Sequence, residues 1–262
     1  MSENATNRNI SEFKVYDRRY VGTKETFAYL LNDFSNAFHI NQYTDRFIWD
    51  VVKIDFKTNA LVSLFTGAWD IINDPIIATL VDKTRTRWGK FRPYLVSFQI
   101  PMTLLGALYW FLPFFFPGTA ATHIPKLIYY FAFNVVNETA GTFTSIAKAG
   151  YMTTITPHPN DRTRLITLAN FASGFFGEKL PEQAVTILID VLRSLYLHDS
   201  SKLATAYTNL FVGMGVFTTV ASSASSFWFF YNSKERVMQS IKTPSVMMSI
   251  KSVIRNKPLL LI

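Results

Sequence analysis

Two long stretches of this chain contain no charged residue, and they limit the folds that it can adopt. Tyr94–Phe116 runs for 23 residues and Leu203–Tyr231 for 29 residues without Asp, Glu, Lys or Arg. Each is longer than the roughly 20 residues that an α-helix needs to cross the hydrocarbon core of a bilayer. The mean hydropathy of only +0.15 averages these runs with very polar connectors. The sequence therefore predicts an all-α integral membrane protein.

Four further candidate spans are less uniform, because charged residues interrupt them. Together with the two uncharged runs they predict a bundle of six transmembrane helices. Proline residues at positions 75, 101, 113 and 181 fall inside spans, where membrane helices tolerate kinks. The four additional spans are expected at about Thr26–Trp49, Thr58–Val81, Pro125–Ile155 and Leu165–Leu192.

The charges of the connectors predict the orientation of the bundle. Lys83–Arg92 contains five basic and no acidic residues, and alternate connectors are poorer in Lys and Arg. Since basic loops favour the cytoplasmic side, both termini are expected in the cytoplasm, with the protein in the plasma membrane. Lying between two spans, the basic run is interpreted as facing solvent or lipid headgroups, not nucleic acid.

No secretory signal peptide is evident in Met1–Val21. The expected organisation is a cytoplasmic segment (1–23), a six-helix bundle (24–232), a cytoplasmic central loop (233–257) and the start of a seventh helix (258–262).

Three polar residues in the second span indicate a cation site. Asp70, Asn73 and Asp74 are spaced i, i+3, i+4, so they share one helical face. Their oxygens suit hard cations, and two close carboxylates tend to retain a proton unless a cation arrives. This pattern predicts a site for Na⁺ or H⁺. The alternative is a structural ion pair with a basic residue on another helix.

Other polar residues within the spans have two interpretations. Asp33 could accept hydrogen bonds from the hydroxyl groups of a substrate, or pair with a base such as Lys148. The aromatic clusters Trp110–Phe116 and Phe227–Tyr231 are interpreted as belts facing lipid or the interface. Charged residues expected to face the bundle interior, as ion pairs or ligands, are Glu138, Lys148, Glu178, Lys179 and Glu182.

Signatures of enzymes are missing from the sequence. The chain has no Cys, its four His residues are scattered, and no nucleophile elbow, His-Glu-x-x-His pair or phosphate-binding glycine loop is present. An intramembrane protease could use Asp33 and Asp70, but the glycine-containing context around such acids is not evident. We expect neither an enzyme nor a cofactor.

Two motifs resemble those of a known transporter family. Trp69–Pro75 (WDIINDP) and Thr84–Pro93 (TRTRWGKFRP) are similar to the signature of the glycoside–pentoside–hexuronide:cation symporters, part of the major facilitator superfamily. The similarity continues through Asp161–Arg164 and Asn256–Leu260. It implies the N-terminal half of a twelve-helix transporter, with a missing C-terminal half of six helices.

The resemblance also implies binding residues. The cation site would comprise Asp70, Asn73, Asp74 and Thr142, with Na⁺ or H⁺ as the coupling ion, while Asp33 corresponds to a sugar-binding Asp. Ser145, Ala149 and Asn170 stand where a galactoside carrier of the family has Asp, Trp and Arg. The resemblance therefore implies another glycoside, a pentose derivative or a uronide, and Lys148 and Lys179 would favour an anionic sugar.

The implied function is cation-coupled sugar symport by alternating access. Basic and acidic residues at the cytoplasmic side would latch one state of the transporter. The alternative is a truncated half that does not transport and is inert, a sensor or an assembly partner. The residues of this gate region are Lys83, Arg85, Arg87, Lys90, Arg92, Asp161, Arg162 and Arg164.

Overall fold

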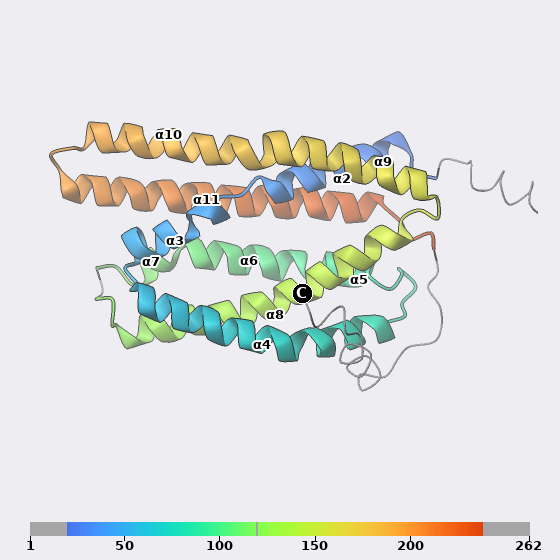
Figure 1. Cartoon of the computed structure of the whole chain (residues 1–262), viewed down its shortest axis with the longest axis horizontal. Helices are drawn as coiled ribbons and strands as arrows, with labels where there is room; N and C mark the ends of the chain where they lie inside the picture. Colours follow the sequence, from blue (N-terminus) through green and yellow to red (C-terminus); the bar gives the residue numbers. More distant parts are fainter. Residues whose placement is uncertain (1–19, 119, 238–262) are drawn as a thin grey trace, which may run out of the picture.

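Helices form the framework of the protein in a computed structural model that describes residues 20–118 and 120–237 (Figure 1). The predicted start of a seventh helix at 258–262, and most of the predicted terminal segments, lie outside the described residues. The α-helices are α2 (Thr23–Ala37), α3 (Thr44–Arg46), α4 (Phe56–Lys83), α5 (Arg92–Ser97), α6 (Gln99–Trp110), α7 (Leu112–Phe115), α8 (Ile124–Thr154), α9 (Pro159–Ala172), α10 (Lys179–Leu195) and α11 (Ser200–Asn232). A 3₁₀ turn, η1 (Asn41–Tyr43), and two π-helical segments, η2 (Phe47–Val52) and η3 (Ser173–Glu178), connect some of them.

Each of the six predicted spans is helical over most of its length, but three are interrupted. The first continues from α2 through η1, α3 and η2, and the fifth joins α9 to α10 through η3. The third divides into α5, α6 and α7 at Phe98 and Phe111. Pro101 and Pro113 explain these two breaks, because neither has an N–H to bond the carbonyl four residues earlier. Pro75, in contrast, stays inside a continuous α4.

The helices pack in two groups that α6 joins. One group contains α2, which packs on α11, α9 and η3, and the other contains α4 packed on α8. Figure 1 shows α10 and α11 running side by side, with α4 and α8 on the opposite side of the molecule. α6 packs on both α11 and α8. Its Trp110 lies so close to Gly215 of α11 that a Cβ at position 215 would overlap the indole ring.

Two separate apolar clusters hold the two ends of the bundle. The Tyr151 cluster includes Ala28, Tyr29, Tyr151, Phe229 and Phe230. The Phe47 cluster, at the other end, includes Ile40, Phe47, Trp110, Leu112 and Phe211. Since α4, α8 and α11 contribute to both clusters, the middle of each of these helices lies between them.

The interpretation of the aromatic clusters as outward-facing belts is only partly right. Trp110, Phe229 and Phe230 are buried in the apolar clusters, where they pack against neighbouring helices. Phe114 and Tyr231 are exposed, as a belt requires. Spacing along one helix cannot tell a lipid-facing ring from one that faces another helix.

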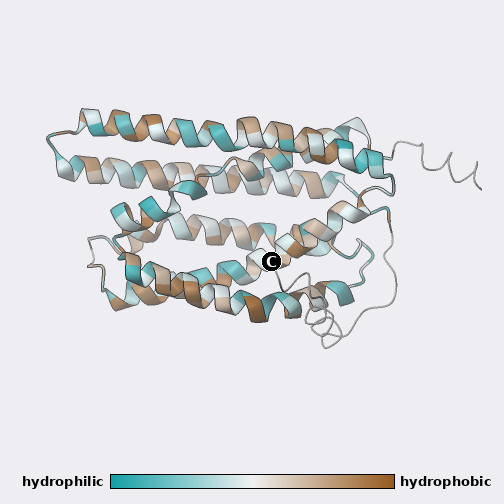
Figure 2. Ribbon diagram, in the orientation of Figure 1, coloured by the Kyte–Doolittle hydropathy of each residue, from teal (hydrophilic) through white to brown (hydrophobic). Residues whose placement is uncertain are grey.

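The outer surface exposes many large apolar side chains. On α4 these include Leu64, Phe65, Ile71 and Ile72, and Figure 2 shows hydrophobic residues along the outer faces of several helices. Monomeric soluble proteins rarely expose large contiguous apolar patches, so this surface suits contact with lipid. Among the described helices, one, Ser200–Asn232, is long and apolar enough to cross a membrane by length and composition.

Candidate cation and substrate sites

The candidate cation site forms where α4 packs on α8. The indole N–H of Trp69 donates to the hydroxyl of Thr139 at 2.9 Å, which fixes the register of the two helices. In this register the hydroxyl of Thr142 donates to Oδ1 of Asp74 at 3.1 Å. The structure therefore brings together Asp74 and Thr142, which are 68 residues apart in the sequence.

Some polar atoms at this site have no hydrogen-bond partner among the described residues. Oδ1 of Asp70 and Nδ2 of Asn73 are both buried and unpaired. The alternative interpretation was an ion pair with a basic residue on another helix. Within the described part of the chain, neither Asp70 nor Asp74 forms an ion pair with a Lys or Arg. Buried polar groups normally have partners, so the unpaired atoms leave room for a ligand.

The ligand set contains oxygens only from carboxylates, an amide and a hydroxyl. Asp70, Asn73, Asp74 and Thr142 provide oxygen ligands, which hard cations prefer. Within residues 20–118 and 120–237, no group of three or more His, Cys, Asp and Glu side chains is placed to hold a metal ion. The set thus suits Na⁺ or a proton better than a transition metal, which prefers nitrogen and sulfur.

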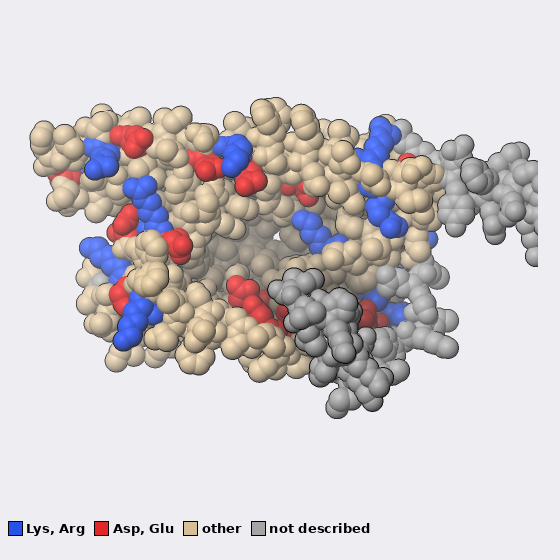
Figure 3. Space-filling model, in the orientation of Figure 1, with Lys and Arg blue, Asp and Glu red and all other residues tan. Residues whose placement is uncertain are grey.

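A cavity of about 660 Å³ lies in the middle of the bundle, between the two apolar clusters. Its volume falls within the range of small-molecule sites. The space-filling view in Figure 3 shows the molecule hollowed between α10 and the α4–α8 pair, with acidic and basic side chains around the hollow. Its lining is mostly amides and hydroxyls, with an aromatic patch; the lining includes Asn32, Asn36, Gln99, Asn134, Asn137, Tyr109, Trp110, Thr144, Ser145, Ser222 and Ser226.

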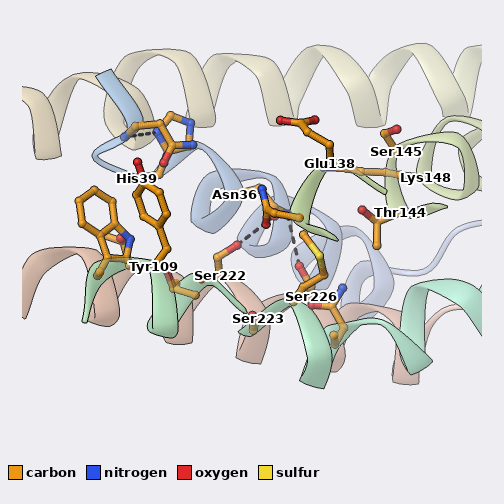
Figure 4. Close-up of a pocket in the computed structure, with 18 of the residues that line it drawn as sticks. Asn36, His39, Tyr109, Glu138, Thr144, Ser145, Lys148, Ser222, Ser223 and Ser226 are labelled. Carbon is orange, nitrogen blue, oxygen red and sulfur yellow. Dashed lines mark hydrogen bonds between the residues drawn. The ribbon is translucent and has the colours of Figure 1, made fainter. Parts of the chain in front are cut away.

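An Asn–Ser network on one wall of the cavity was not predicted. Ser222 donates to Oδ1 of Asn36 at 3.0 Å, and Ser226 donates to Oδ1 of Asn32 at 2.7 Å, which ties α11 to α2 (Figure 4). The amide nitrogen of Asn32 is buried and unpaired in the described structure. The sequence contained one indication of this network. Asn32 and Asn36, and likewise Ser222 and Ser226, are spaced i, i+4 within apolar helices, so each pair lies on one helical face.

The structure places the predicted substrate residues in different environments. Ser145 and Lys148 line the cavity, as Figure 4 shows. Asp33, Ala149 and Asn170 are not among the lining residues, and Ala149 and Asn170 are exposed. The suggested ion pair between Asp33 and Lys148 is not formed within the described residues.

The other charged residues of the spans also separate into two types. Lys179 and Glu182 form an ion pair of 3.0 Å on α10, as one of the two interpretations predicted. Both side chains are substantially exposed, so the pair contributes little to stability. The expectation that Glu178 and Lys179 face the interior is wrong for the described bundle, because both residues are exposed. Glu138 lines the cavity instead, one helical turn before Thr142 on α8.

The predicted gate residues gather at the end of the bundle that contains the Tyr151 cluster. Lys90 pairs with Asp82 at 2.6 Å, and Arg85 donates to the carbonyls of Asp82 and Thr84. Arg92 donates to the carbonyls of Phe230 and Tyr231 at the end of α11. These contacts link the connector after α4 to the last turn of α11.

Glu235 and Arg236, which follow α11, bind three other helix ends. The Glu235 carboxylate accepts hydrogen bonds of 2.8 to 2.9 Å from the backbone N–H groups of residues 90, 91 and 92, at the start of α5. Arg236 makes a two-pronged ion pair with Glu25 of α2, at 2.6 and 2.9 Å, and its backbone N–H donates to Thr154 at the end of α8. The hydrogen bonds that the Arg236 guanidinium donates to the Glu25 carboxylate raise the pKa of Arg236. Neither residue was predicted to have a role.

The remaining predicted gate residues lie at the same end. Asp161 accepts a hydrogen bond from the backbone N–H of Tyr20 at 2.9 Å, and Arg162 donates to the carbonyls of Thr153 and Thr156. Arg87 lies over the ring of Trp88. At the opposite end, Lys126 is fully buried and donates to the carbonyl of Val52 at 3.0 Å. The folded chain thus gathers the basic connectors at one end of the bundle.

Comparison with protein families gives the class to which this fold and site belong. A model described as "MFS/sugar transport protein" matches residues 30–262. Because the match covers most of the chain, the chain belongs to this family of transporters. The family assignment agrees with the resemblance that the Trp69–Pro75 and Thr84–Pro93 motifs suggested.

Several curated proteins are similar to the chain over most of its length. An uncharacterized symporter of Synechocystis is 28% identical over 84% of this chain and 39% of its own length. The isoprimeverose transporter of Lactiplantibacillus pentosus is 25% identical over 93% of this chain and 49% of its own length. The glucuronide carrier protein homolog of Escherichia coli is 22% identical over 90% of this chain and 49% of its own length. The chain therefore spans about half the length of the relatives that it matches.

Proposed function

We propose that this chain is one half of a symporter that couples the uptake of a sugar or glycoside to Na⁺ or H⁺. Its helices would form six membrane spans in the plasma membrane, with both ends of the bundle sequence in the cytoplasm. A second half of six helices would be its partner, providing the opposite wall of the substrate site. Membrane lipid would cover the exposed apolar faces.

One observation supports this proposal most directly. The Asp74–Thr142 contact of 3.1 Å assembles an oxygen-lined site in which Oδ1 of Asp70 is buried without a hydrogen-bond partner among the described residues. A buried carboxylate at membrane depth costs at least about 2.5 kcal/mol unless something compensates its charge. A reversible cation would supply that compensation, and the polar cavity beside it would hold the substrate.

Coupling would follow from the closeness of the two sites. A cation bound at Asp70 and Asp74 would cancel their mutual repulsion and favour the arrangement that binds the sugar. By linkage, the sugar would strengthen cation binding by the same factor. The loaded bundle would then rock against its partner half, with the contacts of Lys90, Arg92 and Glu235 latching the cytoplasmic side.

The amide- and hydroxyl-rich lining favours a polyhydroxylated substrate. Asn32, Asn36 and Ser145 are suited to the hydroxyl groups of a glycoside, while Lys148 would attract the carboxylate of a uronide. One relative is named an isoprimeverose transporter and another a glucuronide carrier protein homolog. A transport assay should therefore include a neutral glycoside, a pentose-containing disaccharide and a glucuronide.

The test is uptake of these labelled sugars by the complete gene product, with and without a sodium gradient and with and without a proton gradient. We expect an ion gradient to drive accumulation of at least one sugar above its external concentration. Asp74→Asn should reduce the accumulation ratio to one, because the amide cannot balance the charge of a cation. Asp190→Asn, on the exposed face of α10, is the matched control and should transport normally. Uphill uptake in the Asp74→Asn variant would refute the proposal.

A further inference from the structure

The Asn–Ser network (Asn32, Asn36, Ser222 and Ser226) has hydrogen bonds that run in one fixed direction. The amide nitrogen of Asn36 lies 2.7 Å from the backbone carbonyl oxygen of Asn32, and a carbonyl oxygen can only accept a hydrogen bond. This contact identifies the nitrogen of the Asn36 amide, so the other end of the amide, which faces Ser222, is its oxygen. The backbone of α2 therefore sets the direction of the network.

Both hydroxyl hydrogens of the network are used within it. Ser222 donates to Oδ1 of Asn36 at 3.0 Å, and Ser226 donates to Oδ1 of Asn32 at 2.7 Å. The oxygen of Asn32 is identified in the same way as that of Asn36, since it also accepts from the Asn36 amide nitrogen at 3.0 Å. A serine hydroxyl has one hydrogen, so neither serine has a hydrogen left for a ligand.

The amide hydrogens of the network are not open to the cavity either. Nδ2 of Asn36 has acceptors for both of its hydrogens, because it lies within 3.4 Å of the carbonyl oxygen and Oδ1 of Asn32 and of Oγ of Ser226. Nδ2 of Asn32 has no partner among the described residues, but it is buried, and Asn32 is only 1% exposed. The network thus has no accessible hydrogen to donate.

Ser222 is the serine of the network that a substrate can reach most easily. It is half-buried and lines the cavity, whereas Ser226 is buried. Figure 4 shows Ser222 on the wall of the cavity, bonded to Asn36. Within residues 20–118 and 120–237, no side chain or backbone group donates to Oγ of Ser222, so its two lone pairs remain open.

Resting on the proposed symport function, we propose that Ser222 is a substrate-binding residue that accepts a hydrogen bond from one hydroxyl group of the sugar. Asn36 and Asn32 are positioning residues, because they hold the hydrogen of Ser222 away from the substrate. In this arrangement both amides serve the hydroxyl groups of the substrate through Ser222. The wall therefore selects a sugar with a hydrogen to donate at this position, and it disfavours a group that can only accept.

The test measures the affinity of the purified complete protein for methyl glucoside, methyl xyloside and methyl glucuronide, and for analogues with one ring hydroxyl removed or replaced by fluorine. Fluorine can accept a weak hydrogen bond but has no hydrogen to donate. At one ring position we expect the deoxy and the deoxyfluoro analogue to bind about fivefold more weakly than the parent glycoside, and equally so.

A double-mutant cycle assigns this loss to Ser222. In the Ser222→Ala variant, the parent glycoside and both analogues at that position should bind alike, because the acceptor for the hydroxyl group is gone. Ser223→Ala is the matched control. It removes a cavity hydroxyl of the same helix that lies outside the network, so the fivefold difference between parent and analogues should persist.

Asn36→Leu separates the positioning role of Asn36 from simple packing. Loss of the amide frees the hydrogen of Ser222, which can then donate to fluorine. In this variant the deoxyfluoro analogue should therefore bind more tightly than the deoxy analogue, although the two are equal in the wild type. A merely structural role would weaken all ligands together and leave the two analogues equal. If Asn36→Leu does not fold, the cycle with Ser222→Ala still decides the role of Ser222.

The possible failures are distinguishable. A parent glycoside that binds without any ring position showing the expected losses would overturn the role of Ser222 and leave the symport function standing. The same holds for a Ser222→Ala variant that keeps the wild-type differences. Equal binding of the two analogues to a folded Asn36→Leu variant would overturn the positioning role of Asn36. Binding of none of the three parent glycosides would instead overturn the proposed function together with this inference.

Discussion

The contact between Glu235 and the start of α5 allows a quantitative prediction. Its carboxylate accepts hydrogen bonds from the backbone N–H groups of Lys90, Phe91 and Arg92 at 2.9, 2.8 and 2.8 Å. These are N–H groups at a helix start, which have no partner within the helix. Gly89 makes the approach possible, because its φ of 110° suits glycine and a Cβ there would overlap the carboxylate.

The magnitude follows from the number of bonds. Glu235 is partly exposed, so water can replace it, and each lost bond should cost about 1 kcal/mol, or about 3 kcal/mol for Glu235→Ala. Gly89→Ala should lose the same bonds and add about 1 kcal/mol of backbone strain, for a total of about 4 kcal/mol. The double variant should also lose about 4 kcal/mol, not the sum of about 7 kcal/mol, since both changes remove the same contact.

The assay is the free energy of unfolding in detergent micelles, measured for the complete protein and the three variants by denaturant titration. Glu178→Ala removes an exposed acid of η3 and is the control, with an expected change within about 0.5 kcal/mol. Additive losses in the double variant would refute the reasoning, because they would mean that Gly89 and Glu235 act independently. A loss below about 1 kcal/mol in Glu235→Ala would show that water fully replaces the carboxylate.

Two further predictions concern packing and pH. Gly215→Ala should lower the free energy of unfolding by about 1–3 kcal/mol, because its new methyl group would overlap Trp110. Gly213→Ala is the control, because the space around Gly213 is open and the change should not destabilise the protein. Denaturant titration in micelles compares the two variants, and equal effects would contradict the packing argument. Hydrogen bonds from the hydroxyl and backbone N–H of Thr58 lower the pKa of Asp55, the N-cap of α4, so its contribution to stability is present at neutral pH and is lost as the pH falls through that lowered pKa. In the Asp55→Asn variant, the free energy of unfolding should therefore change less with pH below about pH 4 than in the wild type. The same pH dependence in both proteins would contradict the stabilising role of the Asp55 carboxylate.

Features carried by a single segment could be predicted from the sequence. The apolar runs predicted where helices form, and the i, i+3, i+4 spacing placed Asp70, Asn73 and Asp74 on one face of α4. Pro101 and Pro113 were expected to permit kinks, and the helix breaks before them agree with that. These properties depend on residues that are close in the sequence.

Features that need two helices to meet could not be derived from one sequence. The pairing of Asn32 with Ser226 joins residues 194 positions apart, and hydropathy carries no information on which helices become neighbours. The same limit explains why Phe229 was assigned to an outer belt although it is buried. The neighbouring positions of Asp74 and Thr142 came from the family resemblance, which contains that information indirectly.

The separation of the two apolar clusters affects which amino-acid substitutions the protein can accept during evolution. The packing that resists unfolding is concentrated at the extremities of the bundle, whereas the residues around the cavity contribute few of those contacts. Replacement of a cavity residue such as Ser145 or Lys148 would alter the shape and charge of the cavity without removing contacts within the two apolar clusters. Under the proposed function, substitutions at the cavity would change substrate preference one side chain at a time, because stability and substrate choice would depend on different parts of the same helices.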